Sequence, residues 1–124
     1  MKNLKIVILL VLVFLIPKGL IADDNAWFPI IPPEPSVKAI VEHYSHVYGV
    51  SKTFMEKIIT CESGWNTNAH NSKNEDSWGL VQINRSKKAH PEVSIEQAID
   101  PYFSIPFLAN GISKGKSGEW TCAR

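Results

Sequence analysis

The sequence predicts a mainly α-helical domain of the α+β class, in which a short loop or hairpin region lies beside the helices. Three observations support this class. Apolar residues recur at helical spacing in three segments between residues 36 and 112. A polar, turn-prone segment at 66–77 precedes a short apolar run. No long segment alternates between apolar and polar residues as a half-exposed strand does.

The first two helices are expected at 37–48 and 52–62, where apolar residues keep a period near 3.6. Ser36 and Ser51 stand directly before these segments, and a serine hydroxyl in that position accepts a hydrogen bond from an amide of the first turn. Gly49 is a typical helix stop. The two helices are therefore expected to be separated by a short turn.

The region after the second helix is expected to form a small hairpin within residues 66–84. Its apolar run at 78–83 fits either a strand or a buried turn of helix. Farther along, Ser94 and Gln97 have the spacing of a capping box, which predicts the start of another helix.

A last helix is expected after Asp100. Aspartate is a good N-cap, and Pro101 fits the first helical position because the amide lost there has no partner within the helix. The apolar stripe of this helix consists of Ile105, Leu108, Ala109 and Ile112. Pro106 conflicts with a straight helix, so we expect a kink or a later start.

The chain is expected to divide into a secretory signal peptide at 1–22, a proline-rich linker at 23–35 and the domain at 36–124. A basic start precedes an apolar run that is shorter than the ~20 residues a membrane-spanning helix needs. Ala22 is a small residue suited to the cleavage position. The alternative is an uncleaved N-terminus that anchors the protein to a membrane.

Composition narrows the range of partners. Three of the thirteen Lys and Arg residues lie in the predicted signal peptide, so its removal leaves ten basic and twelve acidic residues and a formal net charge of −2. No basic patch is evident, and nucleic acid is therefore not an expected partner. No metal and no organic cofactor is expected, since His43 and His46 lack the spacing of the zinc-protease helix motif. We expect a monomer.

The sequence has two cysteines, Cys61 and Cys122. Two free thiols, an intermolecular pair or one intramolecular disulfide are the alternatives. An exported chain resides where disulfides persist, and this favours the intramolecular bond. Such a bond would stabilise the domain by roughly 4 kcal/mol on the loop-entropy model.

Glu62 is the candidate catalytic residue. Helical spacing places it on the same face as Met55 and Ile58, the apolar side of its helix. A carboxyl group in an apolar pocket can stay protonated near neutral pH and donate a proton to a glycosidic oxygen, as in lysozyme. Trp65 and Trp78 could offer flat faces to sugars. The alternative is a solvated glutamate beside two tryptophans of the core.

Two segments of the sequence resemble the catalytic core of the soluble lytic transglycosylase (SLT) family, within the lysozyme-like superfamily. They are Cys61-Glu62-Ser63-Gly64-Trp65 with Ala69 and Asn71, and Ser77-Trp78-Gly79-Leu80-Val81-Gln82-Ile83-Asn84. The Glu-Ser pair alone is a weak signal, whereas both segments at this separation form a fairly specific pattern. The resemblance spans roughly 37–122 and implies a lysozyme-like fold whose hairpin region forms one side of a glycan cleft.

The resemblance implies a role for each matching residue. Glu62 would be the catalytic acid, and Ser63 would support the loop at the helix end. Ser77 would form a hydrogen bond near the reacting sugar. Gly79 would allow the backbone to approach the glycan closely, and Gln82 would contact the glycan or position Glu62.

The resemblance also implies an activity, a lytic transglycosylase of peptidoglycan glycan strands in the periplasm, the cell wall or the exterior. Glu62 would protonate the bond between N-acetylmuramic acid (MurNAc) and N-acetylglucosamine (GlcNAc). It would then accept the proton of the muramyl C6 hydroxyl, giving a 1,6-anhydro product. Cys61 and Cys122 resemble the pair that ties the catalytic helix to the C-terminal segment.

Two alternative functions stay open. A hydrolytic muramidase, which uses water, needs a second carboxylate. Glu75 and Asp76 precede Ser77 and are interpreted first as solvated loop charges. Asp76 keeps hydrolysis open, because goose-type lysozymes have a carboxylate in this region, whereas Asn84 argues against it because many of them have aspartate there. The other alternative is a non-catalytic, lysozyme-like module that binds the cell wall.

Overall fold

A computed structural model describes residues 34–124, which form one unit by their internal contacts. The predicted signal peptide at 1–22 and nearly all of the predicted linker at 23–35 lie outside the described residues. Within the described part, no helix is both long enough and apolar enough to cross a membrane.

The first two helices are α2 (Val37–Tyr48) and α3 (Lys52–Ser63), as the sequence predicted. The hydroxyl of Ser36 accepts a hydrogen bond from the amide of the third residue of α2, at 3.3 Å, and Ser51 does the same for α3, at 3.2 Å. α2 ends at Gly49, whose φ of 63° is a left-handed conformation that glycine adopts without steric cost. The predicted caps are therefore confirmed.

Three strands of two residues each follow: β1 (His70–Asn71), β2 (Ser77–Trp78) and β3 (Ile83–Asn84). β2 lies between β1 and β3, and both pairings are antiparallel. This confirms the small hairpin predicted within 66–84. The apolar run at 78–83 divides between the end of β2, a turn and the start of β3.

α4 (Ile95–Ile99) begins with the predicted capping box. The hydroxyl of Ser94 accepts from the Gln97 amide at 3.1 Å, and the Gln97 side-chain oxygen accepts from the Ser94 amide at 2.9 Å. α5 (Pro101–Ser113) follows directly, and its N-cap Asp100 joins the two helices.

Pro106 lies inside α5, which already begins at Pro101. The predicted later start is wrong, because the carboxylate of Asp100 accepts a hydrogen bond from the Tyr102 amide at 2.9 Å and so starts the helix at its first turn. Pro106 lacks the N–H that would have bonded to the Tyr102 carbonyl, and its ring crowds that carbonyl, so a kink at this position stays a prediction.

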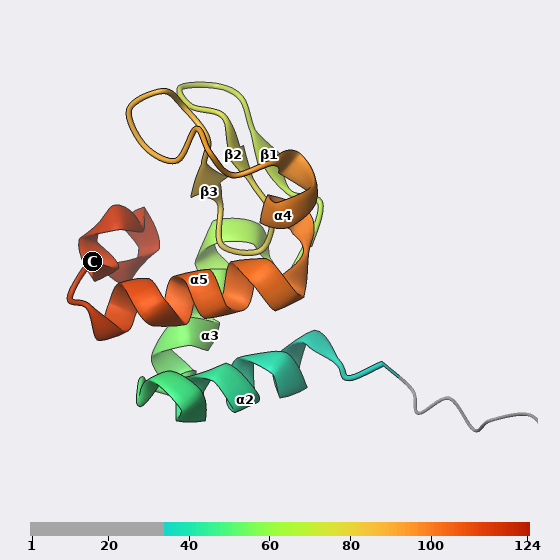
Figure 1. The fold of residues 1–124 in the computed structure, drawn as a ribbon, viewed down its shortest axis with the longest axis vertical. Helices are drawn as coiled ribbons and strands as arrows, with labels where there is room; N and C mark the ends of the chain where they lie inside the picture. The colour runs from blue at the N-terminus through green and yellow to red at the C-terminus, as the bar shows by residue number, and fades with distance from the viewer. Residues whose placement is uncertain (1–33) are drawn as a thin grey trace, which may run out of the picture. The chain divides into compact units, whose positions relative to one another are not determined.

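The core lies between the helices and the sheet. In Figure 1, α5 lies between α2 and the part that carries the sheet and α4. Side chains from all these parts of the chain are fully buried, including Val41, Met55, Ile58, Ile59, Leu80, Val81, Ala98, Ile105, Leu108 and Ala109. The structure is a small, mainly helical domain with a short three-stranded sheet, and the predicted fold class is confirmed.

The C-terminal segment contains two 3₁₀ turns, η2 (Ser117–Glu119) and η3 (Thr121–Ala123), and η3 packs against α3. The predicted intramolecular disulfide is present: Cys61 in α3 is bonded to Cys122 in η3, with 5.8 Å between the Cα atoms. The bond spans 61 positions, which corresponds to a stabilisation of roughly 4 kcal/mol on the loop-entropy model.

Candidate active site

Glu62 lies in the last turn of α3 and is half-buried. Met55 and Ile58, which share its helix face, are fully buried, so this face runs from the core to a surface depression at Glu62. The carboxylate oxygen Oε1 of Glu62 accepts a hydrogen bond from the backbone amide of Cys122, with a distance of 3.1 Å between N and Oε1. The carboxylate therefore lies at the edge of the core and is hydrogen-bonded to the C-terminal segment.

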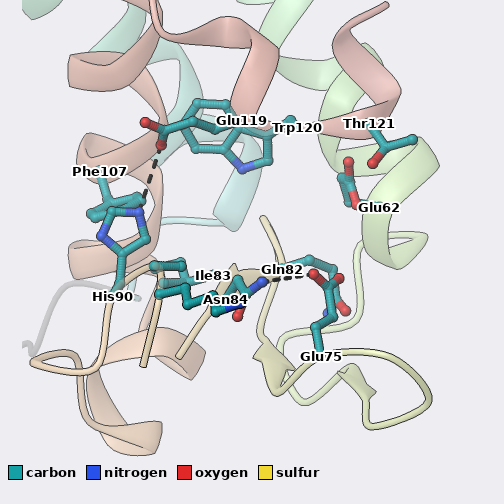
Figure 2. Close-up of a pocket in the computed structure, with 12 residues that line it drawn as sticks. Glu62, Glu75, Gln82, Ile83, Asn84, His90, Phe107, Glu119, Trp120 and Thr121 are labelled. Carbon is teal, nitrogen blue, oxygen red and sulfur yellow. Dashed lines mark hydrogen bonds and ion pairs between the residues drawn. The ribbon is translucent and has the colours of Figure 1, made fainter. Parts of the chain in front are cut away.

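Two cavities meet at Glu62. The first has a volume of about 340 Å³ and extends towards His90 and Glu119, while the second, of about 590 Å³, extends over β1 and the loop after it. Glu62, Glu75 and Gln82 line both cavities. We call the two cavities together the groove. Figure 2 shows Glu62 beside Thr121 at one end of the first cavity and the His90–Glu119 pair at the other.

Glu75 is the second carboxylate of the groove. It lies in the loop between β1 and β2, is exposed, and its Oε2 atom accepts a hydrogen bond from Nδ2 of Asn84 at 2.8 Å. The interpretation of Glu75 as a solvated loop charge is therefore incomplete, since its side chain is both solvated and part of the groove lining. Asn84, whose amide argued against hydrolysis, holds this carboxylate.

Asp76 does not line either cavity. Its Oδ1 accepts from the indole N–H of Trp78 and bonds to Nε2 of His70 at 3.2 Å, and its Oδ2 accepts from Nη1 of Arg85 at 2.9 Å. The hydrogen bond from Trp78 is the main cause that lowers the pKa of Asp76, with smaller contributions from His70 and Arg85 against a desolvation effect that raises it. Asp76 thus ties the end of the loop to β1, to β2 and to the segment after β3.

Trp78 and Trp65 have structural partners. The ring of Trp78 is stacked on His70, with 3.8 Å between the ring centroids. Trp65 donates its indole N–H to the hydroxyl of Thr60 at 2.9 Å, and the Lys38 ammonium lies 5.4 Å from its ring centroid. Both rings pack against the core, and neither lines the groove.

Gln82 combines a left-handed backbone with two side-chain hydrogen bonds. Its φ is 50°, which is uncommon for a residue other than glycine. Its Nε2 donates to the carbonyl of Ala69 at 3.2 Å and to that of Gly79 at 3.0 Å. Gln82 therefore connects the turn before β1 to the turn after β2 while it lines both cavities.

The three remaining predicted site residues, Ser63, Ser77 and Gly79, lie in different surroundings from one another. Ser63 lines the second cavity and donates its hydroxyl to the Ile59 carbonyl at 3.1 Å. Ser77 is fully buried, and its hydroxyl has no hydrogen-bond partner among the described residues. Gly79 is buried with φ of 81°, and a Cβ atom built on it would lie 1.9 Å from the Ala98 carbonyl oxygen. The close approach that Gly79 permits here is to α4, and neither it nor Ser77 lines the groove.

The far end of the first cavity contains residues that the sequence did not single out. His90 lies 3.6 Å from a carboxylate oxygen of Glu119 and 3.4 Å from one of Glu92, and the edge of its ring faces Phe107. Phe107 and Glu119 belong to segments distant from His90 in the sequence, so no local pattern could bring these three together. Within residues 34–124, no group of three or more His, Cys, Asp or Glu side chains is arranged to hold a metal ion.

A half-buried carboxylate at the meeting point of two cavities is an arrangement that glycan-cleaving enzymes require, so the geometry makes this class a candidate. Comparison with protein families supports this class: the model of the Transglycosylase SLT domain matches residues 39–113. This match covers more than half of the chain, so the protein belongs to the SLT transglycosylase family, which implies cleavage of peptidoglycan glycan strands. Neither the curated proteins nor the solved structures provided a match.

Proposed function

We propose that the protein is an exported lytic transglycosylase that cleaves the β-1,4 bond between MurNAc and GlcNAc and leaves a 1,6-anhydro-muramyl product. The observation that carries the proposal is the position of Glu62, whose carboxylate lines both cavities in a chain of the SLT family. A glycan strand that follows the groove would place sugars on both sides of this carboxylate.

Glu62 has the two roles of acid and base in this reaction. Among the described residues, only Oε1 has a hydrogen-bond partner, so Oε2 is the atom available to exchange a proton. Oε2 delivers its proton to the glycosidic oxygen as the bond to the muramyl C1 breaks. The C6 hydroxyl of the same sugar then bonds to C1 and transfers its proton to Oε2, which restores the acid.

Two of the predicted substrate contacts, Ser63 and Gln82, line the groove and are proposed to bind the glycan. Ser77 and Gly79 are proposed to act from beneath it, by supporting the strand and turn that hold Gln82. No cofactor is part of the proposal.

Export is supported by the disulfide between Cys61 and Cys122, because such bonds persist in oxidising compartments. We accordingly propose a signal peptide at 1–22, a linker at 23–35 and a catalytic domain at 36–124 that acts in the periplasm, the cell wall or the exterior.

Hydrolysis is the second candidate function, and Glu75 is the observation that favours it. A muramidase uses a second carboxylate to activate water, and Glu75 lines both cavities together with Glu62. Its hydrogen bond from Asn84 fixes one of its oxygens. In this reaction a water molecule, instead of the C6 hydroxyl, would attack C1.

The test is a digestion of purified peptidoglycan followed by mass spectrometry of the released muropeptides. The variants are Glu62→Gln, Glu75→Gln and, as a matched control on the same helix, Glu56→Gln, which lines neither cavity. Anhydro products that disappear only in Glu62→Gln support the proposal. Products heavier by one water, lost in both Glu62→Gln and Glu75→Gln, would instead identify a hydrolase. Retained wall binding with no product would refute both activities.

A further inference from the structure

The hydrogen bond to Glu62 comes from a residue that is distant in sequence and fixed in space. The backbone amide of Cys122 donates to Oε1 of Glu62 at 3.1 Å, across 60 positions. Cys61, the neighbour of Glu62, forms the disulfide with the same Cys122. One half of the cystine therefore precedes the carboxylate in the chain, and the other half supplies its hydrogen-bond donor.

We propose that Cys122 is a positioning residue for Glu62, and that the C-terminal segment 117–124 is a working part of the active site. This inference rests on the proposed function. A glutamate side chain has three rotatable torsions, and a donor held by the fold restricts them so that the proton-exchanging oxygen stays in one place. Oε1 is occupied by the amide, and Oε2 is left directed to the substrate.

Any residue at position 122 other than proline has a backbone N–H. The position of this donor therefore depends on the path of the backbone and not on the side chain at position 122. Two further contacts set this path. The indole N–H of Trp120 donates to the carbonyl of Val81 at 2.8 Å, and this hydrogen bond is buried. A Cβ atom at Gly111 would lie 2.6 Å from the Trp120 ring, so the absence of a side chain on α5 makes the space for the indole.

The same segment forms part of the groove wall. Glu119, Trp120 and Thr121 line the first cavity beside Glu62, and Figure 2 shows Thr121 next to Glu62. A shift of the segment would therefore change the wall and the carboxylate together. The disulfide, the indole hydrogen bond and the space at Gly111 hold the groove wall and the Glu62 carboxylate in fixed positions relative to each other.

The test compares two variants that both lack the disulfide. Cys61→Ser/Cys122→Ser keeps the amide at position 122, whereas Cys61→Ser/Cys122→Pro removes this N–H. Position 122 is the middle residue of the 3₁₀ turn η3, and the typical 3₁₀ φ of about −50 to −70° overlaps the range that proline adopts. A hydrogen bond to a charged group has a typical strength equivalent to a factor of about 10 to 100 in rate. We expect kcat on purified peptidoglycan to fall by about this factor in the proline variant relative to the serine variant, with KM unchanged.

Equal kcat values in two folded variants would overturn the inference. So would a loss in kcat that is matched by a rise in KM, because that pattern would indicate damage to the groove wall instead. Circular dichroism and the thermal midpoint of each variant show whether both are folded.

A second measurement tests the inference if the proline variant does not fold. In the wild-type protein, the amide proton of Cys122 is followed by NMR and compared with that in Glu62→Ala, which has no side-chain acceptor. A change in its chemical shift, with the Ala123 amide unmoved, supports the bond, since Ala123 donates to the Trp120 carbonyl instead. An unchanged Cys122 proton would overturn the inference.

The two proposals fail in different ways. If the oxidised wild-type protein releases no glycan products, the proposed function is refuted before any variant is made, and the catalytic meaning of the Cys122 amide with it. If the wild type is active and the serine and proline variants are equal, only the further inference is refuted.

Discussion

Replacement of Gly79 by alanine tests how rigidly the hairpin packs on α4. Two costs add. An L-residue at φ of 81° is in the left-handed region, at a cost of about 1–2 kcal/mol. The new Cβ would lie 1.9 Å from the Ala98 carbonyl oxygen, so the turn or α4 must move by about 1.5 Å to reach an ordinary contact. Overpacking of this kind costs about 1–3 kcal/mol.

We therefore expect Gly79→Ala to lower the free energy of unfolding by about 3 kcal/mol, a large part of the ~5–13 kcal/mol typical of a domain of this size. Gly49→Ala is the matched control. Its φ is 63°, but nothing lies within 4 Å of the added Cβ, so only the conformational cost of about 1–2 kcal/mol applies. Urea unfolding followed by circular dichroism measures both variants.

Equal destabilisation of the two variants would refute the reasoning, since it would mean that α4 moves away at no cost. Digestion assays on folded Gly79→Ala separate the structural role from a direct one. Because Gly79 does not line the groove but accepts a hydrogen bond from Gln82, which does, we expect any rise in KM to accompany the loss of stability; a raised KM with normal stability would indicate a direct approach to the glycan.

Three further predictions concern stability. Asp76→Asn is expected to lower the urea midpoint at pH 7 and to have a smaller effect at an acidic pH below 3.8, the ordinary pKa of an aspartate carboxyl. Because the pKa of Asp76 is lowered in the folded protein, its carboxylate stabilises the fold above the unfolded-state pKa. This stabilisation is lost as the pH falls through the folded-state pKa. Equal effects of the substitution at both pH values would contradict this reasoning. Trp120→Phe leaves the buried Val81 carbonyl without its donor and is expected to lower the free energy of unfolding in urea by about 1–3 kcal/mol. An unchanged free energy of unfolding would show that the hydrogen bond is dispensable. Ser94→Ala removes half of the capping box with Gln97 and is expected to cost about 1 kcal/mol; an unchanged thermal midpoint would show that α5 alone orders this region.

Most of the fold could be predicted from sequence because its determinants are local. Ser36, Ser51, Ser94 and Asp100 each act on amides within the following turn, and the structure confirms all four as caps. The later start expected from Pro106 was wrong, because the proline rule describes a lost hydrogen bond and a clash, whereas the cap at Asp100 decided where the helix begins.

The candidate site could be predicted where one segment of the sequence carried the information. Glu62 follows from helical spacing together with the two family segments, whereas the roles of Glu75 and Asp76 depend on which of two adjacent side chains faces the groove. Neighbouring residues in a loop have no fixed period, so only the fold reveals that Asp76 bonds to Arg85 and that Glu75 bonds to Asn84. The Cys122 amide has no side-chain signature at all.

The disulfide gives the domain the topology of a ring. Every residue that lines either cavity lies between Cys61 and Cys122 in the sequence, while α2 lies outside the ring. A single proteolytic nick in the exposed loop at 72–75 would leave both fragments joined as one molecule, and only a second nick or reduction would separate them. After one such cut, the ring would keep the complete set of groove residues covalently joined.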